Sequence, residues 1–248
     1  MLLDLADDDT LPSRPQLELP SVTATDFGGS TSCGHRRTEN QDRWGEASGL
    51  RFVVADGMGG YKGGAEAATW AVSEFLAAPS GLGWDTALRT INTAVRHAML
   101  DQNFGDAGTT LVGLVIDSDQ LTVVAIGDSR AYRLRSRQLE CLTKDHNLGN
   151  LRASGVEHEL HGPDRALTSY LGSPNNAQQI DITTCTVVNR ERFLLCSDGV
   201  SLQLAPETLR QVLTDSSTCQ QAADALVQAS DAVGGRDNAT ALVVDLQS

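Results

Sequence analysis

The stretch Val53-Val54-Ala55-Asp56-Gly57-Met58-Gly59-Gly60 passes directly from an apolar run to a carboxylate and a cluster of glycines. Residues 51–55 are short, apolar and rich in β-branched side chains, which predicts a buried strand. Because Gly57 has no side chain, a ligand can approach the backbone next to Asp56. A strand that delivers one carboxylate to such a point is one way to build a metal site.

The same pattern of apolar run, aspartate and glycine recurs further along the chain. One apolar run leads into Asp198-Gly199, and another leads into Gly127-Asp128. Asp and Gly are common wherever a strand meets a turn, so a single copy carries little weight. Three copies indicate carboxylates that converge on one place, and Asp237 adds a further carboxylate in a Gly-rich loop before the last apolar run.

Length and composition predict one globular domain. The chain has 248 residues, of which 40% are hydrophobic, and this is enough for a sizeable core. Residues 21–248 contain no linker-like stretch, so we expect a single domain there. Residues 1–20 combine an aspartate run with prolines and little periodicity, which predicts an acidic, flexible extension.

Charge and hydropathy argue against several classes of protein. The formal net charge of −13 repels phosphate backbones, so we expect no nucleic-acid partner. No apolar run reaches the ~18 residues of a membrane span, so we expect no membrane-spanning segment. The N-terminus turns acidic at Asp4 without a basic region, unlike a secretory signal.

Cysteine usage points to a compartment. The five cysteines are odd in number and show no CxxC spacing, which argues against a disulfide framework and against a zinc site. Reduced thiols of this kind are typical of cytoplasmic proteins, so we expect a cytoplasmic location.

Periodicity and turn residues predict helices packed on antiparallel sheets. We expect helices over 63–78, 85–100, 207–213 and 218–230, and strands over 22–32, 111–116, 121–126, 131–134, 180–188, 192–196 and 241–246. The strands within 111–134 are expected to form one meander. We interpret 36–44 as a polar loop and about 146–165 as an exposed flap, with Asn147 or Asp145 capping a short helix that ends at Ser154-Gly155.

Taken in order, these motifs resemble the metal-dependent, type 2C serine/threonine protein phosphatases (the PPM family) in their compact bacterial form. The resemblance spans roughly residues 22–246. It implies an α+β fold, an αββα sandwich of two antiparallel β-sheets flanked on each side by an antiparallel helix pair. The motifs that carry it are Arg37, Asp42, Asp56-Gly57, Gly108-Thr109-Thr110, Gly127-Asp128-Ser129, Ser197-Asp198-Gly199 and Asp237-Asn238.

The resemblance also implies a core site for two Mn²⁺ or Mg²⁺ ions, and a third, weaker ion. Asp56 would bridge both core ions, and the carbonyl of Gly57 would bind one of them. Asp198 and Asp237 would bind the other. Asp128 matches the residue that holds the third ion together with Asp198.

Further residues are assigned by the same resemblance. Arg37 matches the arginine that binds the substrate phosphate, so Arg37, Asp56 and Asp198 are the expected catalytic residues. Asp42 and Asn238 would support the site from behind the ligands. The chain departs from many relatives in having Met58 where a proposed general acid, histidine, follows Asp-Gly, and Gln41 where glutamate precedes Asp42.

The chemistry fits these residue types. A phosphomonoester dianion repels nucleophiles, and two hard cations held by oxygen ligands neutralise that charge and activate a bridging water for in-line attack. The expected substrates are proteins phosphorylated on serine or threonine, including those modified by a Ser/Thr protein kinase and the kinase itself. No cysteine lies in a phosphate-cradling loop, which argues against a thiol-phosphate intermediate.

Alternative functions leave other traces in the sequence. The main one is a non-catalytic phosphatase-fold module that regulates or binds phosphoproteins. A P-loop hydrolase is disfavoured because the stretch from Gly57 to Lys62 has the wrong spacing and Gly63 follows the lysine. A serine hydrolase is disfavoured because Gly127-Asp128-Ser129-Arg130-Ala131 lacks the closing glycine of GxSxG.

Overall fold

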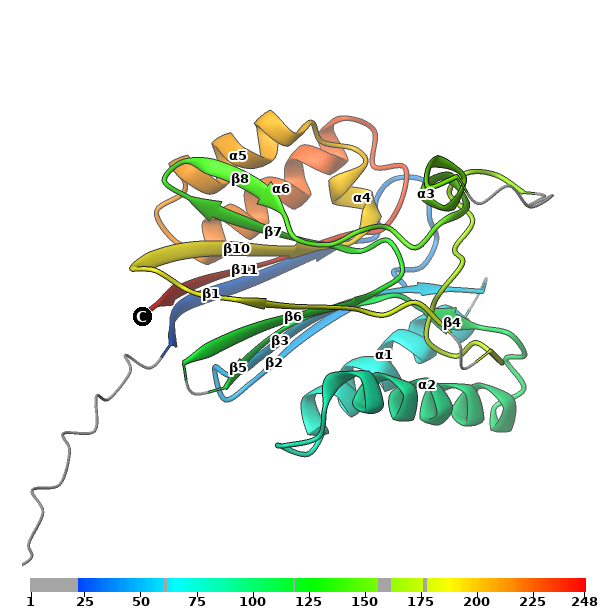
Figure 1. Cartoon of the computed structure of the whole chain (residues 1–248). Coiled ribbons are helices and arrows are strands. Elements are labelled where there is room, and N and C mark those ends of the chain that lie inside the picture. Colours follow the sequence, from blue (N-terminus) through cyan, green and yellow to red (C-terminus); the bar gives the residue numbers. More distant parts are fainter. Residues whose placement is uncertain (1–21, 60–61, 118, 156–161, 176–177) are drawn as a thin grey trace, which may run out of the picture.

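A computed structural model describes residues 22–59, 62–117, 119–155, 162–175 and 178–248. It shows two antiparallel β-sheets stacked face to face, with helices on both outer sides (Figure 1). The extension expected over 1–20 lies outside the described residues, as does the middle of the expected flap. The αββα sandwich predicted from the sequence is confirmed.

Each sheet combines strands from distant parts of the chain. The first sheet has the order β1-β11-β10-β7-β8, with β1 Thr23–Ser32, β7 Arg130–Arg135, β8 Gln138–Cys141, β10 Arg190–Cys196 and β11 Ala239–Gln247. The second has the order β2-β3-β5-β6-β9, with β2 Asp42–Ala47, β3 Arg51–Met58, β5 Leu111–Asp117, β6 Gln120–Ile126 and β9 Asp181–Cys185; β4 Gly108–Thr109 pairs with β3.

The helices form the outer layers (Figure 1). The second sheet is covered by α1 Lys62–Ala77 and α2 Trp84–Asp101, and the first by α4 Asp198–Ser201, α5 Pro206–Asp215 and α6 Cys219–Ala232. The short α3 Leu148–Ala153 begins where the sequence predicted, because the Asn147 side chain accepts the N–H of Asn150. None of the described helices is both long enough and apolar enough to cross a lipid bilayer.

Strand periodicity divides the core into layers. In β3, Phe52 and Val54 point between the two sheets, where they pack with Phe193 of β10, whereas Val53 points toward α1 and packs with Phe75. Both faces of β3 are therefore buried, which is why its sequence reads as a continuous apolar run. A third cluster lies between the first sheet and α4–α6.

The expected three-strand meander is wrong at its second turn. The strands β5 and β6 do pair, but β7 leaves them and pairs with β10 and β8 in the other sheet. The segment Gly127-Asp128-Ser129 is thus a crossover between sheets, and Gly127 adopts a positive φ of 104° there. The sequence could not reveal this because β6 and β10 are both apolar, so hydropathy alone does not decide which of them β7 pairs with.

The polar loop expected over 36–44 is also partly wrong. Its last residues belong to β2, which pairs antiparallel with β3 so that Asp42 lies opposite Asp56. One of its polar residues is Arg43, whose side chain donates to Thr69 of α1 and to the carbonyl of Asn40. Such tertiary partners override the local preference of a polar segment.

The close approach of α4 to β11 yields a stability prediction. A Cβ at Gly199 would overlap the backbone carbonyl of Asn238, so Gly199→Ala should lower the free energy of unfolding by about 3 kcal/mol. Chemical denaturation checks this. Gly83→Ala, where a Cβ meets nothing within 4 Å and only the N-cap of α2 changes, is the control and should cost no more than about 1 kcal/mol. Equal stability of both variants would contradict the tight packing of α4.

Candidate active site

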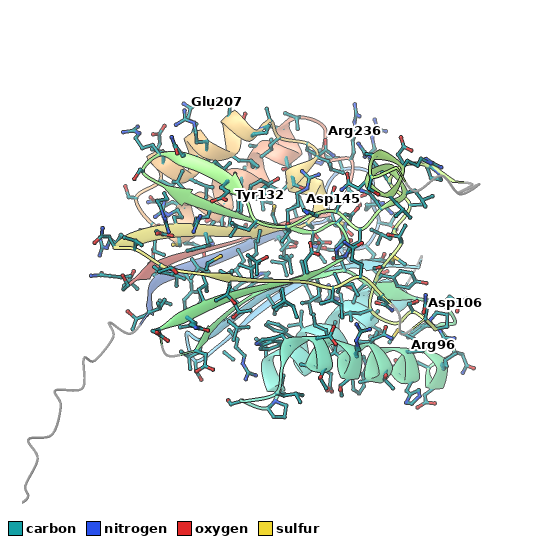
Figure 2. All side chains as sticks on the ribbon, in the orientation of Figure 1. Arg96, Asp106, Tyr132, Asp145, Glu207 and Arg236 are labelled. Carbon is teal, nitrogen blue, oxygen red and sulfur yellow. The ribbon has the colours of Figure 1, made fainter. Side chains whose placement is uncertain are left out.

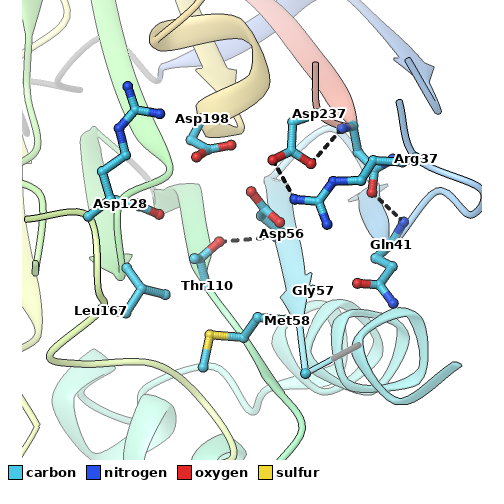
Figure 3. Close-up of a pocket in the computed structure, with 13 residues that line it drawn as sticks. Arg37, Gln41, Asp56, Gly57, Met58, Thr110, Asp128, Leu167, Asp198 and Asp237 are labelled. Atoms are coloured by element: carbon cyan, nitrogen blue, oxygen red, sulfur yellow. Dashed lines mark hydrogen bonds and ion pairs between the residues drawn. The ribbon is translucent and has the colours of Figure 1, made fainter. Parts of the chain in front are cut away.

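The carboxylates singled out in the sequence meet in one cavity at the end of the sandwich (Figure 3). This cavity, which we call the active-site cavity, has a volume of about 310 Å³. It is lined by Asp56, Asp128, Asp198 and Asp237, and also by Gly57, Asn238 and Arg37. Of the predicted site residues, Asp42 alone does not line it.

Each carboxylate arrives on a different element. Asp56 lies near the end of β3, Asp128 lies in the crossover from β6 to β7, Asp198 is the first residue of α4, and Asp237 precedes β11. The two sheets thus contribute to the cavity from both sides. This convergence follows from stacking the sheets with these strand ends at the same edge of the sandwich.

Two threonines, whose role the sequence did not reveal, hold the backbone of Asp56. The Asp56 carbonyl accepts hydrogen bonds from the Thr110 N–H and the Thr109 hydroxyl, both at 2.9 Å. The Asp56 N–H donates to Thr110 Oγ1 at 3.0 Å, and that oxygen also bonds to Ser129 Oγ at 2.7 Å. Thr110 therefore links Asp56 to the residue after Asp128. The only sequence signal was the Gly-Thr-Thr motif.

Asp42 lies behind the cavity. Its side chain is buried, and its Oδ2 accepts a 2.7 Å hydrogen bond from Ser197, while Oδ1 has no partner among the described residues. Burial, offset partly by the Ser197 bond, raises the pKa of Asp42 to about 6. Ser197 precedes Asp198 in the chain and also accepts the Thr240 N–H, so Asp42 ties β2 to the α4 start.

Asn238 and Arg37 organise the loop on the other side. Asn238 accepts the N–H of Gln41 at 2.9 Å and donates to the carbonyls of Cys33 and Glu39. These bonds hold the loop that carries Arg37. The Arg37 guanidinium lies 2.7 Å from Asp237 Oδ2 while its side chain keeps 53% exposure. The positively charged guanidinium of Arg37 is thus accessible to solvent and to a ligand in the active-site cavity.

The electrostatics of the site test whether a metal fits. Burial raises the pKa of Asp56 well above its ordinary value, and the charges of Asp42, Asp198 and Asp128 raise it further. Burial and Asp198 likewise raise the pKa of Asp128 to about 7. Buried carboxylates that raise one another's pKa are costly to ionise unless a cation compensates them. The all-oxygen donor set suits Mg²⁺ or Mn²⁺, so these residues fit the predicted metal centre.

The start of the expected exposed flap is in fact buried. The imidazole of His146 accepts the Gly127 N–H at Nδ1, and its Nε2 lies 3.3 Å from Asp181 Oδ1. Its backbone N–H bonds to the Gly127 carbonyl, and its carbonyl accepts the Thr168 N–H. His146 therefore links the β6–β7 crossover, which carries Asp128, to Asp181 and to Thr168. Within the expected flap, His158 and His161 lie outside the described residues.

This anchoring yields a prediction. We expect His146→Ala to lower the free energy of unfolding by about 2 kcal/mol, because it leaves a cavity and an unpaired buried N–H at Gly127. The measurement is chemical denaturation, compared with His97→Ala on the exposed side of α2, which should be close to neutral. A neutral His146→Ala would mean that the crossover holds its shape without this side chain.

Two stacked sheets with helices outside, and an oxygen-rich cavity facing an arginine, are the features expected of a metal-dependent phosphatase. The family model described as Protein phosphatase 2C matches residues 30–234. The chain belongs to the protein phosphatase 2C family. This confirms the resemblance stated from the sequence, and with it a protein phosphatase as the class of enzyme.

Curated relatives and solved structures agree with this family. The chain is 29% identical to Protein phosphatase PhpP of Streptococcus pneumoniae over 240 residues, covering 87% of this chain and 95% of the relative. It is 30% identical to Serine/threonine phosphatase stp of Listeria monocytogenes, covering 87% and 93%. The catalytic domain of the serine threonine protein phosphatase PstP, solved with 2 manganese ions, matches with a TM-score of 0.78 and 26% identity, covering 92% of this chain and 100% of that one.

Proposed function

We propose that this protein is a serine/threonine protein phosphatase that hydrolyses phosphoserine and phosphothreonine in phosphorylated proteins, with two Mn²⁺ or Mg²⁺ ions as cofactors. The observation that carries the proposal is the convergence of Asp56, Asp198 and Asp237 with Arg37 in one cavity. The relatives, which are protein and serine/threonine phosphatases, support the substrate class, and the manganese ions in the PstP structure support the metal.

The metals would be held by residues from both sheets. Asp56 would contact both core ions, the Gly57 carbonyl one of them, and Asp198 and Asp237 the other. Asp128, with Asp198, would hold the third and weaker ion. When bound, such ions neutralise the phosphate charge and lower the pKa of the water that attacks phosphorus.

The remaining steps belong to the chain's own groups. Arg37 would bind two phosphate oxygens in a forked geometry, which its exposed position beside Asp237 permits. Asp42, Ser197 and Asn238 would keep the ligands in place through the hydrogen bonds described above. Met58 lines the cavity but has no proton to donate, so it does not act as the acid for the leaving alkoxide.

The domain bounds, the location and the physiological substrates are part of the proposal. We place residues 21–248 in one phosphatase domain, supported by sheets that join β1 near its start to β11 at its end. A cytoplasmic location is supported by five cysteines that are all free thiols. Substrates would include the targets of a Ser/Thr protein kinase, and the kinase itself.

The test is hydrolysis of a phosphothreonine peptide and of p-nitrophenyl phosphate with Mn²⁺ and with EDTA. We expect turnover that EDTA abolishes, and a rise in KM for Arg37→Ala, with Arg89→Ala on α2 as the control. Turnover that survives EDTA would overturn the metal mechanism. Absence of turnover while calorimetry still shows Mn²⁺ binding would favour the non-catalytic module instead.

A further inference from the structure

A second, smaller cavity adjoins the active-site cavity. Its volume is about 110 Å³, and it shares Asp198, Asp237 and Arg165 with the larger one. The rest of its lining comes from Gly199, Leu202 and Gln203 of the α4 region and from Arg236. We call it the side cavity. Because the two cavities share walls, a substrate whose phosphate occupies the first can reach the second with a neighbouring group.

Two guanidinium groups line the side cavity from different parts of the chain. Arg165 follows α3 at the end of the flap, and Arg236 lies in the loop between α6 and β11, at the end of the sandwich that carries α3 (Figure 2). Both are exposed. Within the described part of the chain, neither forms an ion pair or hydrogen bond with another side chain, whereas Arg37 and Arg130 are each paired with a carboxylate.

Two arginines that form no ion pair with a described residue thus line one cavity in a chain of net charge −13. The carboxylates of the side cavity, Asp198 and Asp237, are the expected metal ligands, so bound cations would compensate their charge. The two guanidiniums are then left as the charge of the side cavity. A guanidinium presents a fork of N–H donors that matches a carboxylate or phosphate.

The neighbouring groups suit a peptide. Gln203 adds a side-chain amide to the lining, and Leu202 keeps 38% of its surface exposed beside it. A lining that combines polar groups with one apolar side chain is what an extended segment with an acidic side chain would contact. A small free anion would gain no binding energy from contact with Leu202.

We propose that the side cavity is a substrate subsite for a second anionic group close to the phosphorylated residue, supplied by an Asp or Glu side chain or by a second phosphate. This subsite rests on the proposed phosphatase function. It makes Arg165 and Arg236 determinants of substrate specificity, with Arg236 the more selective probe because it does not line the active-site cavity.

The experiment compares phosphothreonine peptides turned over by the full chain with Mn²⁺. One peptide has neutral neighbours, a panel carries a single Asp at each nearby position on either side, and a matching panel carries phosphoserine instead. The readout is the ratio of kcat/KM for an acidic peptide to that for the neutral one. We expect a ratio of about five at one or two positions, the size of an exposed charge-assisted contact. The two panels show whether a carboxylate or a phosphate is preferred.

Variants tie the preference to the side cavity. Arg236→Gln should bring the ratio close to one, Arg236→Lys should keep part of it, and Arg236→Glu should reverse it in favour of a peptide with an Arg neighbour. Arg89→Gln, an exposed arginine paired with Asp85 on α2, should leave the ratio unchanged. The wild-type ratio should fall between about 0.05 M and about 0.5 M salt, because exposed charges are screened.

The outcomes separate the two proposals. A wild-type enzyme that turns over the neutral peptide but shows a ratio near one throughout would overturn the subsite and leave the phosphatase function intact. A preference that persists in Arg236→Glu would also overturn it. If the wild type turns over neither peptides nor p-nitrophenyl phosphate with Mn²⁺, the phosphatase function fails and the subsite falls with it.

Discussion

Asp56→Asn is expected to lower kcat for p-nitrophenyl phosphate by at least about a thousandfold, equivalent to a loss of about 4 kcal/mol of transition-state stabilisation. Asn keeps the shape of the side chain but removes the charge that faces Asp198 and Asp128 across the cavity. It also removes the carboxylate proposed to contact both core ions. The hydrogen bonds from Thr109 and Thr110 reach the Asp56 backbone and remain available in the variant.

Steady-state kinetics with Mn²⁺ measure this effect. Asp85→Asn on the surface of α2 is the control, and it should retain full activity because its ion pair with Arg89 is exposed. Circular dichroism verifies that Asp56→Asn folds. An Asp56→Asn enzyme with more than a tenth of the parent's kcat would remove Asp56 from its proposed place at the centre of the site.

The second large effect is on stability. Adding Mn²⁺ at about a hundred times its dissociation constant should stabilise the metal-free protein by about 2.7 kcal/mol. For a chain of this length, that raises the melting temperature by roughly 5–10 °C. The physical reason is the group of mutually repelling carboxylates, whose pKa values are raised in the absence of a cation.

The same repulsion predicts that Asp198→Asn and bound Mn²⁺ each stabilise the protein, and that the two effects do not add. Asp198→Asn should make the metal-free protein more stable than the parent, by about 1 kcal/mol, because one repelling charge is gone. It should also lose most of the stabilisation by Mn²⁺. Scanning calorimetry with EDTA and with Mn²⁺ measures both, with Asp85→Asn as control. A destabilised metal-free Asp198→Asn would contradict the repulsion.

The gain from Mn²⁺ should depend on pH. The folded-state pKa values of Asp42, about 6, and Asp128, about 7, lie above their ordinary values. Protonation of these groups therefore favours the metal-free fold, and this contribution is lost as pH rises through about 6 to 7. Metal ions compete with those protons. The Mn²⁺-induced rise in melting temperature should thus grow from pH 5 to pH 8, and a constant rise would contradict this.

The local parts of the site could be read from the sequence. Asp56, Asp198 and Asp128 follow apolar runs and are flanked by glycine, and the structure brings all of them into one cavity. The sequence also predicted a cap at Asn147 or Asp145, and the structure shows that it is Asn147. These features depend on residues that are neighbours in the chain, whose preferences for strands, turns and caps act over a few positions.

Other features depended on partners that are distant in the chain. Nothing near Gly127 indicates that β7 leaves the sheet of β6 for that of β10. Thr110 links two segments that are distant from each other in the chain. Its hydroxyl bonds to Asp56 of β3 and to Ser129 of the β6–β7 crossover. The buried position of His146 depended on the same crossover.

The sequence by itself determined most of the helices and strands, the set of metal-binding candidates and the family, because periodicity, glycine turns and the order of motifs are properties of the chain alone. Only the tertiary structure decided which strands share a sheet and that His146 anchors the crossover beside Asp128. It alone placed Arg165 and Arg236 on one small cavity. These follow from non-local burial, which selects one pairing among several that local preferences allow equally.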